Sequence, residues 1–268
     1  MKKLGVKIFA FNEEKNIIPV IRQFEGIEGV RVIATISSKP WYGDVKPDKT
    51  ADLARSTGIE VFEDYWETET EQHDFGMDQL QDCAYVLVSH ADTFFTREDI
   101  KKMVDFIQTA TERQYDMRTY MYWKNLNTVV IPDPLLPAMI IRSDVRFKYG
   151  IIIQDQIVSA PLVPDVICHH LSWAKTDKEV LKKITTYTHA NEIVPDWYGK
   201  VWLADVTEDL SPTFPSDYKG LREHSCPDEI RSLFNGHNHS DSSWCYVCSD
   251  KEANFHIGGI PYKKYETA

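Results

Sequence analysis

The sequence has no apolar run long enough to cross a membrane and no glycine-rich phosphate-binding motif. A membrane-spanning helix needs about 18 or more apolar residues. Neither G-x-G-x-x-G nor a Walker A sequence occurs among the 12 glycines. These absences argue against an integral membrane protein, a dinucleotide oxidoreductase and a P-loop kinase. If a nucleotide binds, metal or basic side chains must neutralise its phosphates in place of a glycine nest.

Cysteine is scarce as well. Five cysteines, an odd number, do not suggest a disulfide framework. Cys83 and Cys168 lie in apolar contexts and are expected to be small buried side chains. Zinc-ligand residue types gather towards the end of the chain, at Cys226, His237, His239, Cys245 and Cys248. Their spacing fits no strong template, so a zinc site and an ordinary loop both stay open.

Basic charge is in deficit, and the net charge is −11. A diffuse acidic surface argues against tight binding of an extended nucleic-acid backbone. The first apolar stretch, Leu4–Phe11, is interrupted by Lys7 and followed by Asn12–Lys15, which is unlike a signal peptide. We therefore expect a cytoplasmic protein without a transmembrane segment.

Strand and helix patterns alternate over roughly the first 108 residues. Expected strands are Val6–Phe11, Val30–Ser37, Ile59–Phe62 and Ala84–Ser89, and expected helices include Thr50–Ser56, Thr68–Gln81 and one that opens at Thr96. This succession predicts an α/β fold with a parallel, doubly wound sheet. Further strands are expected at Tyr115–Trp123, Asn127–Ile131, Ala138–Arg142 and Ile151–Ile153, and a helix at Thr176–Tyr187. We expect residues 1–204 to form the main domain, with a loop-rich extension over 205–268 packed on it.

Polar residues follow three of the expected strands: Asn12 and Glu13, Ser37 and Ser38, and His90 and Asp92. The carboxyl ends of parallel strands meet at one edge of a sheet, where ligands bind. A carboxylate at Asp92 suits Mg²⁺ or Mn²⁺ held against a diphosphate. It could also simply begin the turn before the next helix.

A second group of candidates is the segment Cys168–Thr176. His169 and His170 are adjacent and point in different directions, so at most one is expected to join Asp92 at a cation. Either could instead satisfy a structural hydrogen bond. Lys175 is a candidate to balance phosphate charge.

Five blocks, in this order, resemble the family 2-like glycosyltransferases of GT-A fold: Phe11–Ile17 (N-E-E-x-N-I), Asp48–Val61, Trp66–Gly76, His90–Thr96 (D-A-D-E-x-F-T) and His169–Lys175 (H-H-F-S). The resemblance implies a GT-A-like, Rossmann-type, mostly parallel sheet flanked by helices. It also implies a metal-dependent and inverting glycosyltransferase that moves a sugar from a nucleotide-sugar, with a UDP-sugar as the expected donor, to an acceptor hydroxyl. The expected cofactor is Mn²⁺ or Mg²⁺.

Carried over by position, the resemblance implies roles for individual residues. Ala10, Phe11 and Glu13 would line the nucleoside site. Ser37 and Lys175 would contact other parts of the nucleotide-sugar donor. Asp92 would be a metal ligand, and His170 or His169 a second one. Asp155 falls where the catalytic base is expected, although it could equally be an exposed turn residue.

Two departures matter. His90 replaces the first aspartate of the family's D-x-D motif, which leaves less negative charge for a cation, and Thr35–Ser38 lacks the aspartate that the resemblance implies for contact with uracil. The alternatives are therefore a nucleotidyltransferase on the same fold and a catalytically inactive GT-A-like binding protein. The acceptor stays open among a glycan, a protein, a lipid-linked sugar and a modified nucleic-acid base.

Overall fold

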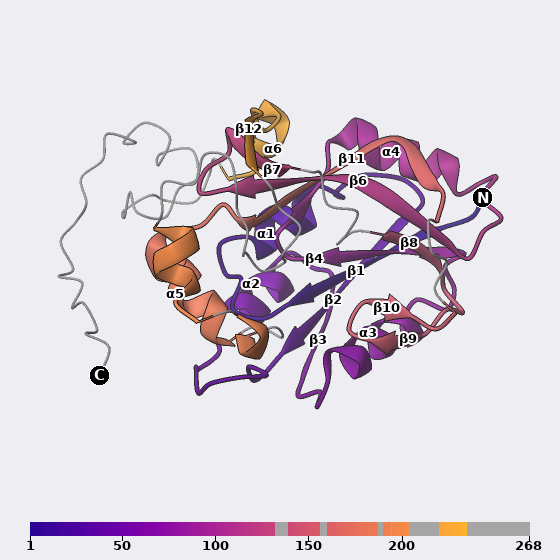
Figure 1. Ribbon diagram of the computed structural model, residues 1–268. Helices are drawn as coiled ribbons and strands as arrows, with labels where there is room; N and C mark the ends of the chain where they lie inside the picture. The colour runs from indigo at the N-terminus through magenta and orange to yellow at the C-terminus, as the bar shows by residue number, and fades with distance from the viewer. Residues whose placement is uncertain (132–138, 156–159, 187–189, 194, 204–219, 235–268) are drawn as a thin grey trace, which may run out of the picture.

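The computed structural model describes residues 1–131, 139–155, 160–186, 190–193, 195–203 and 220–234. Strands and helices alternate in the first part of the chain (Figure 1): β1 (Leu4–Ala10), α1 (Ile17–Arg22), β2 (Val30–Ser37), α2 (Thr50–Ser56), β3 (Glu60–Asp64), α3 (Glu69–Asp78), β4 (Tyr85–His90), β5 (Thr93–Phe94) and α4 (Arg97–Phe106).

The rest of the described chain is richer in strands: β6 (Gln114–Trp123), β7 (Thr128–Ile131), β8 (Met139–Arg142), β9 (Phe147–Tyr149), β10 (Ile152–Ile153), β11 (Leu162–Trp173), α5 (Asp177–Thr186), a 3₁₀ turn at Ala190–Glu192, a π-helical turn at Tyr198–Trp202, β12 (Gly220–Glu223) and α6 (Asp228–Ser232). None of the described helices has both the length and the apolar character that crossing a membrane requires.

Among the described residues, the main sheet runs in the order β12-β7-β6-β8-β4-β1-β2-β3, with β11 paired to β5 and β6. Strand β1 is parallel to β2 and β4, and β2 is parallel to β3. Strand β8 is antiparallel to both β4 and β6, which makes the sheet mixed beyond β4. The predicted α/β fold, a mostly parallel sheet flanked by helices, is confirmed.

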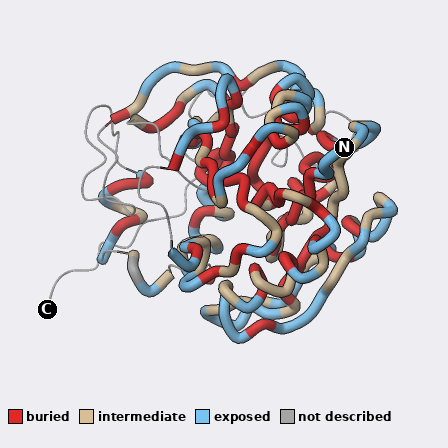
Figure 2. The backbone as a smooth tube through the Cα atoms, turned by 90° about the vertical axis from the view of Figure 1, so that its right-hand side faces the viewer, coloured by how far each residue is buried: buried red, intermediate tan, exposed pale blue. Residues whose placement is uncertain are grey.

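Both faces of the central sheet are covered, and alternate residues of β4 enter different apolar clusters. Val6 and Ile8 of β1 join the apolar cluster that contains residues of α1, α2 and α4. Val86 and Val88 of β4 join a second cluster that contains Met77 of α3 and residues of β8 and β9. Figure 2 shows the resulting pattern, with buried backbone inside and exposed backbone at the periphery.

Strand β11 was not predicted, because its sequence breaks the alternation of apolar and polar residues. Pro164 and Asp165 interrupt the run, Asp165 adopts a positive φ of 53°, and the pairing with β6 shifts register between Leu162 and Ile167. Such a bulge bends a strand and disturbs its pattern. Beyond it the strand is continuous, and it carries His169 and His170 into the centre of the molecule.

The described part of residues 205–268 contributes an edge strand to the same sheet. Strand β12 pairs antiparallel with β7, and Cys226 and Ile230 are buried in the core cluster that covers β1. Cys83 and Cys168 are buried, as predicted. His237, His239, Cys245 and Cys248 lie outside the described residues.

The contact between α3 and β1 leads to a first prediction, at Gly76. A Cβ at this position would overlap Cδ of Lys7 and lie 2.8 Å from its Cγ. Lys7 is fully buried, so its chain has little room to move. Although alanine is the better helix former by about 1 kcal/mol, we expect Gly76→Ala to lower the free energy of unfolding by about 1–3 kcal/mol.

Urea-induced unfolding of the wild type and the variant measures this difference. The same substitution in a Lys7→Ala background is the matched control, because removal of the lysine chain removes the overlap. The penalty should then shrink. An equal penalty in both backgrounds would contradict the assigned contact.

Candidate functional site

Asp92 lies in the turn between β4 and β5 and is 5% exposed. Its backbone carbonyl accepts a hydrogen bond of 2.8 Å from the Leu171 N–H. Beside it, β5 pairs antiparallel with β11, with Thr93 opposite His170. This ladder holds the Asp92 turn against a strand that lies far away in the sequence, and it places His170 next to Asp92.

The Asp92 carboxylate uses its two oxygens differently. Lys183 of α5 lies 3.6 Å from Oδ2 through its Nζ, which also donates to Ser172 Oγ at 2.5 Å. His170 Nδ1 lies 3.4 Å from Oδ1. Within the described part of the chain, Oδ1 is buried and has no hydrogen-bond partner. A buried oxygen of this kind is costly unless a ligand satisfies it.

The charges in this site suit a cation at neutral pH. Burial favours a raised pKa for Asp92, but His170 and Lys183 outweigh it and hold the pKa below its usual range. Burial lowers the pKa of His170 to about 4. Asp92 is therefore ionised while His170 is neutral, and these are the forms in which both side chains bind metal.

A second acidic group adjoins Asp92. Glu13, just beyond β1, accepts a 2.6 Å hydrogen bond from Asn16 Nδ2 and lies 3.4 Å from Lys175 Nζ. Burial raises the pKa of Glu13, Lys175 opposes this shift, and the negative charge of Asp92 adds to it. We define the Asp92 cluster as Glu13, Asp92, His170, Lys175 and Lys183.

Four members of the Asp92 cluster were predicted from the sequence, and Lys183 was not. It lies on α5, whose pattern indicated only an amphipathic helix, and one of its neighbours is the exposed Lys182. No local signal separates these two lysines. Only the packing of α5 against β11 does so, and it brings Lys183 to Ser172.

The other predicted donor residues lie at the same edge of the sheet. Ala10 ends β1 and pairs with Ile36, one residue before Ser37. Ser37 is buried, and its hydroxyl donates to the Lys39 carbonyl at 2.7 Å. Phe11 is half-buried. Their contact with a nucleotide stays a prediction.

Of the two adjacent histidines, the structure brings only His170 to Asp92. His169 points to the other side of β11, where its Nδ1 lies 2.9 Å from the Tyr122 hydroxyl and its ring stacks with His224. Successive side chains of a strand face opposite ways. The option that made His169 a ligand beside Asp92 is therefore corrected, because its imidazole belongs to a separate aromatic group.

The structure does not bring Asp155 to the Asp92 cluster. Asp155 is exposed, and its nearest cation is Arg113, 3.8 Å away. The Arg113 carbonyl accepts a hydrogen bond from the Arg142 N–H, and Arg142 pairs with Tyr85 at the start of β4. Asp155 is therefore connected to the start of β4. Asp92 follows the other end of β4. Asp155 therefore lies apart from the Asp92 cluster, and this geometry gives no support to its predicted role as the catalytic base.

His90 ends β4 beside two groups of rings. It is half-buried, its ring centroid lies 6.4 Å from that of His170 and 6.1 Å from that of His73, and burial lowers its pKa to about 3. His73, on α3, also lies near Glu69. Neither His73 nor Glu69 was predicted from the sequence to be a site residue. Glu69 and His73 are four residues apart, which places them on one face of a helix, and this spacing is the sequence signal by which the pair could have been recognised.

No protein-family model matches this chain, and no curated protein matches its sequence. Among solved structures it is similar to S. aureus TarS 1-349 in complex with UDP-GlcNAc, with 13% identity over 62% of this chain and 55% of that one and a TM-score of 0.41. It is also similar to glucosyl-3-phosphoglycerate synthase from Mycobacterium tuberculosis in complex with Mn²⁺, UDP and glucosyl-3-phosphoglycerate (16% identity, 53% of this chain, 57% of that chain, TM-score 0.36).

A third similar structure is CMP:2-keto-3-deoxy-manno-octonic acid synthetase complexed with CTP, at 11% identity over 53% of this chain and 75% of that one, with a TM-score of 0.38. The chain spans about half the length of the TarS and synthase chains. These values are too low to transfer a site or a reaction to this chain.

Proposed function

We propose that this chain is a glycosyltransferase that binds the diphosphate of a nucleotide-sugar at the Asp92 cluster and transfers the sugar, with inversion, to an acceptor hydroxyl. One observation carries the proposal. A buried, ionised carboxylate has an oxygen without a hydrogen bond beside a neutral imidazole, and two lysines of the cluster lie close by. This is an arrangement for a cation and phosphates at the carboxyl edge of a parallel sheet.

The donor set fits a divalent cation of the Mn²⁺ or Mg²⁺ class. Asp92 Oδ1 and His170 Nδ1 would hold it, because Lys183 contacts the other carboxylate oxygen and leaves Oδ1 open. When bound, the cation supplies electrostatic stabilisation of the diphosphate leaving group.

The lysines are proposed to take the remaining phosphate charge. Lys183 and Lys175 each lie near one carboxylate of the cluster, so their ammonium groups are positioned before a ligand arrives. Preorganised cations of this kind need little rearrangement as negative charge develops. They replace the glycine nest that the sequence lacks. The nucleoside is proposed to extend along β1 and β2 towards Ala10, Phe11 and Ser37, with a UDP-sugar as the donor.

Replacement of Lys183 with methionine tests this arrangement. The variant keeps a long side chain but removes the ammonium group near Asp92. We expect the KM for the nucleotide-sugar to rise by about 10- to 100-fold, since a charge-assisted phosphate contact is worth about 1.5–3 kcal/mol. Initial rates of donor hydrolysis at several donor concentrations measure this.

Lys182→Met is the matched control, because Lys182 is exposed on the same helix. Its KM should equal that of the wild type. Equal KM values for the two variants would count against a role for Lys183 in donor binding.

A further inference from the structure

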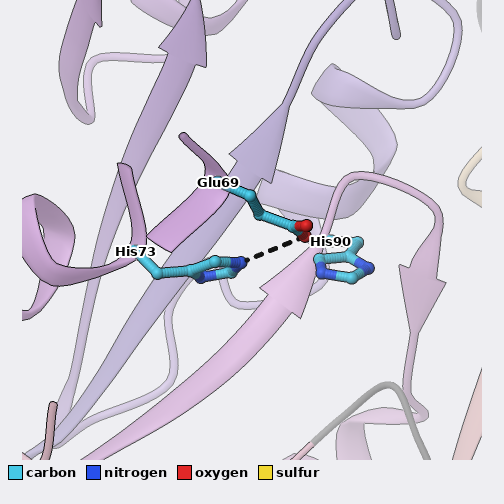
Figure 3. Close-up of side chains that lie close together, drawn as sticks. All are labelled: Glu69, His73 and His90. Carbon is cyan, nitrogen blue, oxygen red and sulfur yellow. Dashed lines mark ion pairs between the residues drawn. The ribbon is translucent and has the colours of Figure 1, made fainter. Parts of the chain in front are cut away.

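Glu69, His73 and His90 form a second cluster at the carboxyl edge of the sheet, on the α3 side. Glu69 begins α3, His73 follows one helical turn later, and His90 ends β4. Figure 3 shows the three side chains converging, with the ion pair between His73 and Glu69 dashed. One ligand atom from each lies within 4.8 Å of the other two.

Two buried nitrogens of this cluster have no hydrogen-bond partner within the described residues. They are Nε2 of His73, whose side chain is fully buried, and Nε2 of His90. His73 Nε2 lies 3.5 Å from Glu69 Oε1, beyond a good hydrogen bond. Unsatisfied buried nitrogens that converge with a carboxylate call for a ligand.

We propose that Glu69, His73 and His90 bind a divalent transition metal of the zinc class, separate from the cation proposed at Asp92. Two imidazoles and one carboxylate form a frequent three-ligand set for zinc, whereas Mg²⁺ prefers oxygen ligands alone. Zinc–ligand bonds of about 2.0–2.1 Å in a tetrahedron place ligand atoms about 3.4 Å apart. The Glu69–His73 separation already meets this spacing.

The surroundings hold the His73 ring in place. It stacks on Phe9 with centroids 4.6 Å apart and an interplanar angle of 7°, and Phe147 covers it at 4.8 Å. Lys7 contacts its other nitrogen, Nδ1, so Nε2 is the atom that faces Glu69. Binding through Nε2 would put the ring proton on Nδ1, on the side of the ring that faces Lys7.

Three protein ligands leave the fourth position of a tetrahedral ion open. The open position would take a water molecule or an oxygen of a bound molecule. His90 also lies towards His170, so a metal here would adjoin the Asp92 cluster without sharing a ligand with it. The proposal does not depend on the glycosyltransferase function.

Titration of the full chain with Co²⁺ tests the site, because tetrahedral Co²⁺ gives strong visible absorption. We expect one equivalent to give this absorption in the wild type and in the Cys245→Ser/Cys248→Ser variant. Glu69→Gln and His90→Asn should weaken Co²⁺ binding by at least about tenfold, since even the loss of an outer-shell partner costs 10- to 100-fold. Asp92→Asn should leave the tetrahedral absorption unchanged, because a cation at the Asp92 cluster would be held by other residues.

Thermal unfolding shows which variants are folded. If only one of Glu69→Gln and His90→Asn folds, that variant alone is enough for the test. His73 is not substituted, because its full burial endangers folding. The proposal is overturned if the wild type gives no tetrahedral absorption. It is also overturned if a folded ligand variant gives the tetrahedral absorption with the same Co²⁺ affinity as the wild type, or if this absorption disappears in the cysteine variant or in Asp92→Asn.

Discussion

Replacement of Asp92 with asparagine is expected to lower the rate of donor hydrolysis by about 10²- to 10³-fold while the chain stays folded, a loss comparable to that of one key electrostatic group in other active sites. The amide keeps the shape of the side chain but removes its charge. The proposed cation then loses an ionised ligand, and Lys183 loses its counter-ion. Both changes weaken the stabilisation of the leaving diphosphate.

Rates of UDP release from a UDP-sugar, measured with Mn²⁺ present, give the size of this effect. Far-UV circular dichroism of the variant checks that it folds. Asp155→Asn is the matched control, because Asp155 is an exposed carboxylate outside the Asp92 cluster. Its rate should equal that of the wild type. Unchanged turnover in Asp92→Asn would contradict the assignment of the site.

Mild acid is expected to destabilise the fold strongly. Burial lowers the pKa of His90 and of His169 to about 3 and that of His170 to about 4, and burial also brings the pKa of His73 well below its usual value. In the unfolded chain each histidine titrates near 6.5. Between pH 6.5 and about 4 the unfolded chain therefore binds more protons than the folded chain, and stability falls as the pH falls.

Each histidine can contribute up to about 1.4 kcal/mol per pH unit in this window. Together they could remove several kcal/mol between pH 7 and pH 5, a large part of the usual 5–15 kcal/mol stability of a domain. The raised pKa of Glu13 works in the opposite direction and offsets part of the loss.

Urea-induced unfolding at pH 7, 6 and 5 measures this dependence. His169→Gln is the informative variant, because the amide can still meet the Tyr122 hydroxyl while one titrating group is lost. Its free energy of unfolding should change less steeply with pH than that of the wild type. The same free energy of unfolding for the wild type at pH 7 and pH 5 would contradict neutral buried histidines.

The sequence predicted the position of a residue correctly where that residue directly follows a recognisable strand. Apolar runs followed by Glu13, Ser37 or Asp92 predicted side chains at one edge of a parallel sheet, and the pairing of β1 with β2 and β4 confirms that these strands are parallel. The alternation of helices and strands was also predictable, because the spacing of apolar residues within each segment shows which of its own faces is buried.

Long-range packing accounts for what the sequence did not reveal. Asp155 follows β10, and only the fold shows that this point lies near the start of β4 rather than its end. Whether His169 or His170 faces Asp92 depends on the register of β11 after its bulge. Lys183 and Lys182 have the same local sequence signal, and the tertiary contacts of Lys183 with Ser172 and Asp92 separate them.

The binding of a diphosphate with metal at the Asp92 cluster is tested most directly by thermal unfolding of the full chain with UDP, with and without Mn²⁺. A ligand that binds only the folded state at about 100 times its Kd stabilises that state by about 2.7 kcal/mol. We expect UDP to raise the Tm when Mn²⁺ is present, and to raise it much less in Asp92→Asn. No rise with UDP or GDP, or a rise only with triphosphates such as CTP, which favours nucleotidyl transfer, would contradict the account.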